Sequence, residues 1–222
     1  MTMATDAFEM SLVHTVFRCQ LNSAPRLICD VRPGRPRQLN RVADHIANVM
    51  SALHHHHLAE DELLWPVLRD RIPQRAKDIQ QMETEHELIA TSATKVQLLL
   101  ADWVAAADPT NAAHGLVRGV RELADLVDAH LANEEQQVLP LINENITDDE
   151  WRAVTERGGS FIGPRNMRFG IAFVGMVLEA CTADERRRFL AGMPPPQRLL
   201  ARLFARRASA SYHARLAGTP RG

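Results

Sequence analysis

Residues 53–66 read LHHHHLAEDELLWP. Four consecutive histidines, 54–57, are followed after two residues by three consecutive acids, Glu60, Asp61 and Glu62. The run is internal and has four residues, so its position and length do not fit a terminal purification tag. It is either a solvated polar patch or one half of a metal site, and the rest of the chain has to distinguish the two.

The composition describes an ordinary soluble globular protein. The chain has 222 residues, of which 45% are hydrophobic and 24% charged, and its formal net charge of −1 gives no general case for nucleic-acid binding. The longest apolar run, 169–181, contains Glu179 and is shorter than the roughly 18 residues that a membrane span needs. The N-terminus lacks the apolar segment of a signal peptide, and the three cysteines show no CxxC spacing. We therefore expect a cytoplasmic protein with no membrane span.

Helical sequence dominates the first two thirds of the chain. Alternating β-branched runs are missing, while Ala, Leu, Arg and Glu are frequent. Short connections with proline or glycine separate four long helical patterns, which predicts an all-α fold, an antiparallel up-down four-helix bundle over 6–143. The expected helices are 6–22, which stops before Pro25, then 37–71, 73–107 and 113–143, with a turn at 108–111.

The pattern changes to shorter helices in a C-terminal extension, residues 145–222. Thr147-x-x-Glu150 and Thr182-x-x-Glu185 are capping-box signatures that each predict the start of a helix. Three prolines, 194–196, then open a basic amphipathic helix over about 194–207. Its predicted apolar side consists of Leu199, Leu200, Leu203 and Phe204. We expect this extension to pack on the bundle, with docking to a membrane surface or to a partner as less favoured alternatives.

One histidine and one glutamate of the quoted stretch fall on a buried helical seam. Apolar residues of the second predicted helix recur in steps of four, three and four. Continuing this alternation, steps of three, four and three lead from Leu53 to His56, Glu60 and Leu63. His56 and Glu60 therefore share one face of the helix. His57 is an alternative to His56, because His57 and Asp61 have the same four-residue spacing.

The other three helices also place histidines in their seams. His130 and Glu134 interrupt the apolar stripe of the fourth helix with the same i, i+4 spacing, and His86 and His14 lie in the seams of the third and first helices. A single core histidine is usually satisfied by a carbonyl group, but a buried carboxylate without a partner is very costly. Imidazoles and carboxylates that converge at one level form a suitable shell for transition-metal ions. A bundle that holds zinc or no metal is the structural alternative.

These residues resemble the hemerythrin-like (HHE cation-binding) family. The resemblance covers about residues 6–143 and rests on His14 and on three motifs: HHLAEDELLWPVL (56–68), TEHELI (84–89) and HLANEEQQVLPLI (130–142). It implies a four-helix bundle that holds two non-haem iron ions and reacts with O2, peroxide or NO. By position, the implied ligands are His14, His56, Glu60, His86, His130 and Glu134, with the glutamates bridging and Glu135 as an alternative to Glu134.

The chain departs from the family pattern at Ala90. Oxygen-carrying members have a second histidine there, and alanine cannot be a ligand. Four histidines and two bridging carboxylates supply about eight of about twelve positions around two six-coordinate ions, and a bridging oxygen would add two more. We therefore expect a more open centre, which favours peroxide or NO chemistry over reversible O2 storage unless a fifth ligand comes from elsewhere. An iron or O2 sensor without catalytic turnover is the alternative function.

Overall fold

The computed structural model describes residues 5–163 and 166–217. Regular structure in these residues is helical and includes no β-strand, so the predicted all-α class is confirmed. None of the described helices combines the length and the apolar character that a membrane crossing requires. Expectations for residues 1–4, 164–165 and 218–222, including the end of the predicted extension, lie outside the described residues.

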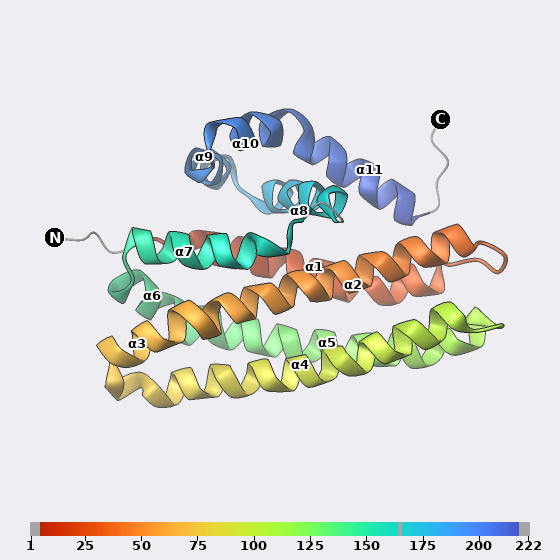
Figure 1. The fold of residues 1–222 in the computed structure, drawn as a ribbon, viewed down its shortest axis with the longest axis horizontal. Coiled ribbons are helices and arrows are strands. Elements are labelled where there is room, and N and C mark those ends of the chain that lie inside the picture. The colour runs from red at the N-terminus through yellow and green to blue at the C-terminus, as the bar shows by residue number, and fades with distance from the viewer. Residues whose placement is uncertain (1–4, 164–165, 218–222) are drawn as a thin grey trace.

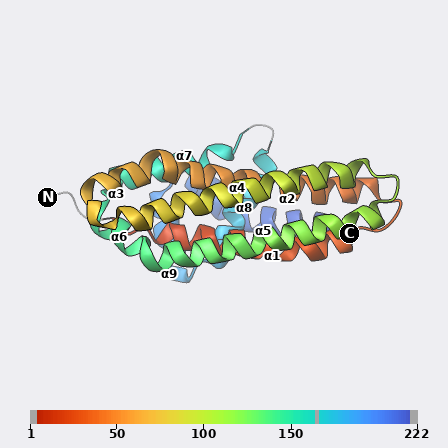
Figure 2. The same cartoon turned by 90° about the horizontal axis from the view of Figure 1, so that it is seen from below.

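Four long helical rods, called the bundle below, lie side by side (Figures 1 and 2). Helix α1 packs on α2 and α5, and α4 packs on the same two helices. The second rod is continuous because α2 passes through one π-helical turn into α3. The elements are α1 (Phe8–Cys29), α2 (Pro36–Ala59), the π-helical turn Glu60–Leu64, α3 (Trp65–Arg71), a 3-10 turn (Pro73–Arg75), α4 (Ala76–Ala105), α5 (Pro109–Gln137) and α6 (Leu139–Asn145).

The predicted end of the first helix at residue 22 is wrong. Helix α1 continues through Pro25 to Cys29. Proline cannot donate a backbone hydrogen bond, but Ala24, Pro25 and Ile28 are all buried, and their burial outweighs the missing bond.

The turn expected at 108–111 is also wrong, because this segment begins α5. The Asp108 side chain accepts a hydrogen bond from the backbone N–H of Thr110 (3.0 Å), and Pro109 occupies the first turn, where no backbone donor is needed.

Shorter helices, called the C-terminal layer below, follow α6 and cover one side of the bundle (Figure 1). Both predicted capping boxes are present, at Thr147 with Glu150 and at Thr182 with Glu185. Helix α7 packs on α2, α8 packs on α1, and α11 packs on α8 and α2. The elements are α7 (Asp148–Gly158), a 3-10 turn (Gly159–Phe161), α8 (Met167–Ala180), α9 (Ala183–Gly192), α10 (Pro195–Leu200), the π-helical turn Ala201–Ala205 and α11 (Arg206–Leu216).

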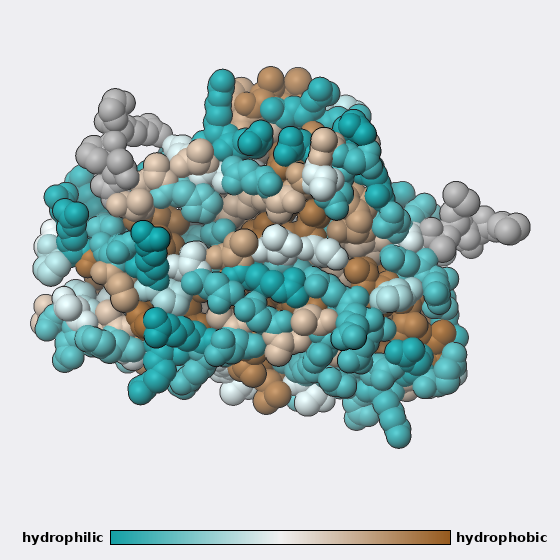
Figure 3. Space-filling model, turned by 180° about the vertical axis from the view of Figure 1, so that it is seen from behind, coloured by the Kyte–Doolittle hydropathy of each residue, from teal (hydrophilic) through white to brown (hydrophobic). Residues whose placement is uncertain are grey.

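One apolar core joins the bundle to the C-terminal layer. Phe17 of α1 and Phe173 of α8 belong to the same buried cluster, with ring centroids 5.7 Å apart. The face of the molecule seen in Figure 3 is mostly hydrophilic with scattered apolar patches. The C-terminal layer therefore lies directly against the helices that carry the histidines.

Candidate metal centre

All four rods contribute to a cluster of histidines and glutamates inside the bundle. The six residues predicted from the sequence converge there. Glu60 and Glu134 have no exposed surface, and the side chain of His56 is the most exposed of the six at 15%. The contributors are His14 from α1, His56 from α2, Glu60 from the π-helical turn, His86 from α4, and His130 and Glu134 from α5.

The cluster contains two groups of possible ligand atoms. His14, His56, Glu60 and Glu134 offer atoms that all lie within 4.8 Å of one another. The second group, with the same spacing, contains His86, His130 and also His57. The histidine rings converge through their Nε2 atoms, which are 3.0 Å apart for the pair His14 and His56 and 3.1 Å apart for the pair His86 and His130.

Both glutamates of the first group also lie close to histidines of the second group. Glu60 places Oε1 3.2 Å from Nε2 of His56, in the first group, and Oε2 3.6 Å from Nε2 of His86, in the second. Glu134 Oε2 lies 3.4 Å from Nε2 of His14 and 3.7 Å from Nε2 of His130, again one histidine from each group. Each of the two carboxylates therefore lies close to histidines of both groups.

His57 is the residue that sequence reasoning treated only as an alternative to His56. In the structure both histidines point into the cluster, one in each group. The His57 ring stacks on His86 with centroids 4.1 Å apart and an interplanar angle of 8°, and its Nε2 is buried without a hydrogen-bond partner. A fifth imidazole is therefore present although Ala90 supplies none. The run of histidines contained the signal, because two adjacent helical residues lie about 100° apart and can border the same seam.

Several buried polar atoms at the centre have no hydrogen-bond partner, and they indicate whether the cluster suits metal ions. Both oxygens of Glu60, both oxygens of Glu134 and Nε2 of His57 are buried and accept or donate no hydrogen bond. Buried polar groups normally have partners, and buried carboxylates need a counter-charge. Five electron-pair donors that face a common interior without hydrogen-bond partners match the needs of bound cations.

Burial keeps histidines of the cluster in the neutral form that metal binding requires. Desolvation lowers the pKa of His14, His56 and His57, so these imidazoles are neutral and able to ligate. Desolvation raises the pKa of Glu60 and Glu134, and each is raised further by a neighbouring carboxylate. A bound cation would supply the positive charge that these two glutamates lack.

A second layer of carboxylates fixes the histidine rings. Nδ1–H of His14 donates to Glu135 Oε1 (2.9 Å), Nδ1–H of His86 donates to Asp61 Oδ1 (2.7 Å), and Nδ1–H of His130 donates to Glu85 Oε2 (2.9 Å). Each bond leaves Nε2 as the atom directed at the centre, which is how metal-ligating histidines are usually oriented.

Glu135, the alternative to Glu134 in the sequence, belongs to this second layer. Its carboxylate lies on His14 and forms two bonds with Arg18 (2.8 and 3.1 Å). Partial burial alone would raise its pKa, but the bonds from His14 and Arg18 dominate and lower the pKa to about 2. Glu135 therefore remains ionised next to a buried imidazole.

The π-helical turn sets the orientation of the acidic residues that follow the histidine run. Pro66 has no N–H for the carbonyl four residues earlier, and the backbone N–H of Trp65 bonds to Glu60 O, five residues back. Within this wider turn Glu60 faces the centre while Asp61 reaches His86. Such turns are frequently found at functional sites.

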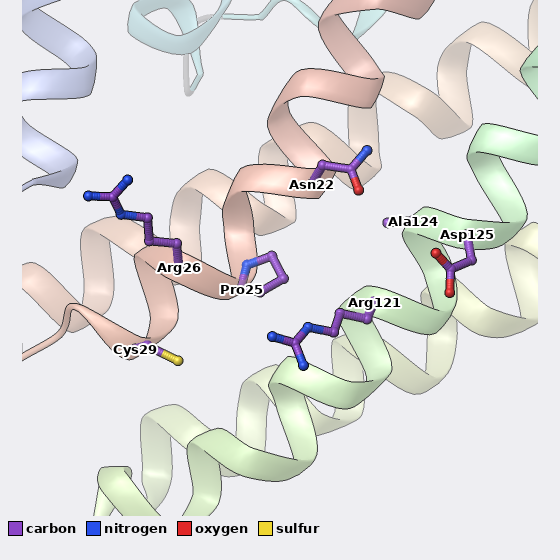
Figure 4. A pocket seen from close by; sticks show the side chains of 7 residues that line it. All are labelled: Asn22, Pro25, Arg26, Cys29, Arg121, Ala124 and Asp125. Carbon is purple, nitrogen blue, oxygen red and sulfur yellow. The ribbon is translucent and has the colours of Figure 1, made fainter.

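A surface pocket of about 300 Å³ lies elsewhere, between α1 and α5 (Figure 4). Its lining includes Cys29, Arg26, Arg121 and Asp125, and none of the residues predicted for the site. The candidate centre is thus an interior cluster separate from this pocket.

A family model described as the hemerythrin HHE cation binding domain matches residues 9–142. The chain belongs to this family. No curated protein and no solved structure matched the chain. The matched range includes every histidine and glutamate of both groups, so the cation-binding domain of this hemerythrin-family protein coincides with the cluster. Together they fit a metal-binding protein.

Proposed function

We propose that this protein holds two non-haem iron ions and reacts there with O2, peroxide or NO. One ion would be held by His14 and His56, the other by His57, His86 and His130, with Glu60 and Glu134 shared between them. The observation that carries the proposal is that Glu60 and Glu134, whose oxygens have no hydrogen-bond partner, each lie close to histidines of both groups. We further propose that residues 6–143 form the up-down four-helix bundle of the family, and that 145–222 are an extension packed on it.

The donor set suits iron among the transition metals that imidazole and carboxylate bind. Imidazole and carboxylate groups suit iron, and the three cysteines, which would favour softer ions, are absent from both groups. When bound, such ions provide a redox-active site with exchangeable positions for a small ligand.

His57 changes the expectation that followed from Ala90. Five imidazole nitrogens and four carboxylate oxygens give nine protein donors. Two six-coordinate ions have about twelve positions, so about three remain for other ligands, where the sequence had suggested about four. The centre is then less open than expected, and reversible O2 binding is a candidate activity equal to peroxide or NO chemistry.

The protein around the centre excludes water and holds protons in place. The Phe17 ring lies 5.4 Å from His56, and the fully buried Trp65 ring lies 6.0 Å from His86. Such walls limit access to small, weakly polar molecules. Asp61, Glu85 and Glu135 hold the Nδ1 protons of three histidines and so maintain the ligating tautomer.

Metal analysis of paired histidine variants tests the proposal. We expect two iron ions per chain in the untagged protein and in His54→Ala, since His54 is exposed and belongs to neither group. His56→Ala should lose about half of the iron, because the first ion would keep only one histidine ligand, His14. Full iron content in His56→Ala, or a protein that retains only zinc, would contradict the proposal.

Contact between the ligand helices and the C-terminal layer supports an iron or O2 sensor as the second candidate. Phe17 touches both His56 and Phe173 of α8, while Gly158 of α7 lies against the backbone of His56. Iron binding could therefore alter the packing of the layer. Hydrogen exchange of residues 148–216 with and without iron distinguishes the functions. For a sensor, the protection of these residues from hydrogen exchange must change with iron. For an enzyme or a carrier, their protection stays unchanged while the protein turns over its ligand or binds it reversibly.

A further inference from the structure

The last helical segment, from α10 through the π-helical turn to α11, packs with its small residues inward. Ala205 and Ser209 are buried at 1% and 0% exposure, next to Gly175 of α8. A Cβ atom at Gly175 would overlap the carbonyl oxygen of Ala205, so the two helices touch through their backbones. This close packing fixes which side of the segment faces away from the molecule.

The outward side is apolar. Four large apolar side chains in α10 and the π-helical turn are between 52% and 59% exposed, although leucine and phenylalanine are normally buried. They fall within residues 199–204, in a segment on the side of the C-terminal layer that faces away from the bundle (Figure 1), and are called the apolar face below. The apolar face consists of Leu199, Leu200, Leu203 and Phe204.

Arginines surround this face without acidic neighbours in the same segment. Arg202, Arg206 and Arg207 are exposed, and residues 194–222 contain no aspartate or glutamate. In the neighbouring α9, Arg187 and Arg188 are paired with Asp184 and Asp6. Among the described residues no carboxylate forms an ion pair with Arg202, Arg206 or Arg207.

We propose that the apolar face lies on the surface of a lipid bilayer that contains anionic lipids. Leucine and phenylalanine would enter the boundary between headgroups and acyl chains, while the arginines meet lipid phosphates and acidic headgroups. The face is a protruding helix edge, which fits a broad and flat partner. The helix lies along the bilayer without crossing it, in agreement with the lack of a helix suited to span a membrane among the described residues.

Charge argues against a second copy of the chain as the occupant. In a two-fold dimer the same face meets itself, so the arginines of one copy would oppose those of the other. No carboxylate in residues 194–222 is available to pair with them. Anionic lipid headgroups provide the missing negative charge.

Vesicle sedimentation of the full-length protein tests this proposal. The probes are sucrose-loaded vesicles of phosphatidylcholine alone or with about 30% phosphatidylserine. We expect binding to the anionic vesicles that is at least tenfold tighter than to the neutral ones and that weakens as salt rises from about 50 to about 300 mM.

Two matched variants separate the apolar face from general changes in charge and folding. Leu203→Glu should weaken binding to anionic vesicles at least tenfold. Leu98→Glu is the control, since Leu98 is another exposed leucine (66%, against 54% for Leu203) on α4 and its substitution makes the same change in charge. Circular dichroism checks that both variants are folded.

Three results would overturn the proposal. The first is no binding of the protein to either kind of vesicle. The second is an equal loss of vesicle binding in Leu203→Glu and Leu98→Glu. The third is a concentration-dependent dimer, seen by light scattering, that Leu203→Glu abolishes. The last would assign the face to a second copy. Iron content serves as an independent readout, because the membrane proposal can fail while the metal centre holds two ions.

Discussion

The candidate metal centre places five histidines and two glutamates inside the bundle, whereas in the C-terminal layer four large apolar side chains lie on the surface. Glu60 and Glu134 have no exposed area, while Leu199 and Leu200 are each 59% exposed. The first arrangement leaves carboxylate oxygens without partners, and the second leaves apolar area in water. Each costs free energy in the isolated chain.

The comparison shows that each unfavourable arrangement would be relieved by a binding partner, with a different chemistry in each region. Cations would neutralise the buried glutamates, and a bilayer would cover the apolar face. A π-helical turn occurs at both places, Glu60–Leu64 in the bundle and Ala201–Ala205 in the layer. Because π-turns shift the register of a helix, they can direct side chains away from the face that ordinary α-helical spacing would give them.

Iron loading should give the largest effect on stability. A ligand at about a thousand times its dissociation constant stabilises the folded state by about 4 kcal/mol. For a protein of this size this raises the thermal midpoint by about 10 °C. Calorimetry of metal-free and iron-loaded protein measures the shift, with His54→Ala as a control that should behave like the natural chain. An unchanged midpoint would favour a bundle that needs no metal.

Disrupting the packing of the C-terminal layer should give the next largest effect on stability. In Gly175→Val the added side chain would overlap the backbone of Ala205, and such overpacking costs about 1–3 kcal/mol. We expect faster hydrogen exchange in residues 195–216 and unchanged iron content. Gly192→Ala is the control, because a Cβ there meets nothing within 4 Å. Loss of iron in Gly175→Val would show that the two regions are not separable.

The buried pair His45 and Tyr212, which joins α2 to α11, should make stability depend on pH. Its side chains are hydrogen-bonded at 3.1 Å, and desolvation, helped by the charge of His213, lowers the pKa of His45 to about 3. The unfolded chain binds this proton near pH 6.5, so the folded state loses stability as pH falls from about 6.5 towards 3.

A variant at this pair measures that dependence. His45→Phe should be less stable at pH 7, because Tyr212 loses its partner, but its disadvantage should shrink by up to about 1.4 kcal/mol per pH unit below 6.5. Chemical unfolding of the metal-free protein at several pH values measures this difference. Tyr212→Phe retains His45 and should keep the natural slope. If the free energy of unfolding changes with pH equally in His45→Phe and in the natural chain, His45 is not the source of the pH dependence.

The exposed ion pair between Arg71 and Glu150, at the start of α7, should give the smallest effect. Hydrogen bonds from Arg71 lower the pKa of Glu150 to about 2. The stability that the pair contributes is present above about pH 4.5 and is lost as pH falls towards 2. We expect Glu150→Gln to cost less than about 1 kcal/mol at pH 7 and almost nothing at pH 2.5, as measured by chemical unfolding. A constant cost at both pH values would assign the effect instead to the hydrogen bond that the Glu150 side chain accepts from the Thr147 backbone N–H.

Much of the fold could be predicted because it depends on local chemistry. The capping boxes at Thr147 and Thr182 satisfy backbone donors within one turn, and both were found where the sequence placed them. Pro25 misled the prediction because its local cost was overcome by burial, which depends on distant residues. Asp108 was assigned to a turn, although its side chain caps a helix.

The amino-acid sequence by itself determined the helical class and the six histidines and glutamates that meet in the interior, because a 3.6-residue period puts them on buried seams. Tertiary structure decided the role of His57 and the exposure of the apolar face. Two adjacent histidines border one seam equally well, and only the approach of α1 and α4 shows that both point inward, one to each group. The four apolar residues were assigned correctly to one side of their helix, but only the contact between Gly175 and Ala205 shows that this side faces outward. Periodicity fixes the faces of a helix, whereas the neighbouring elements decide which face is buried.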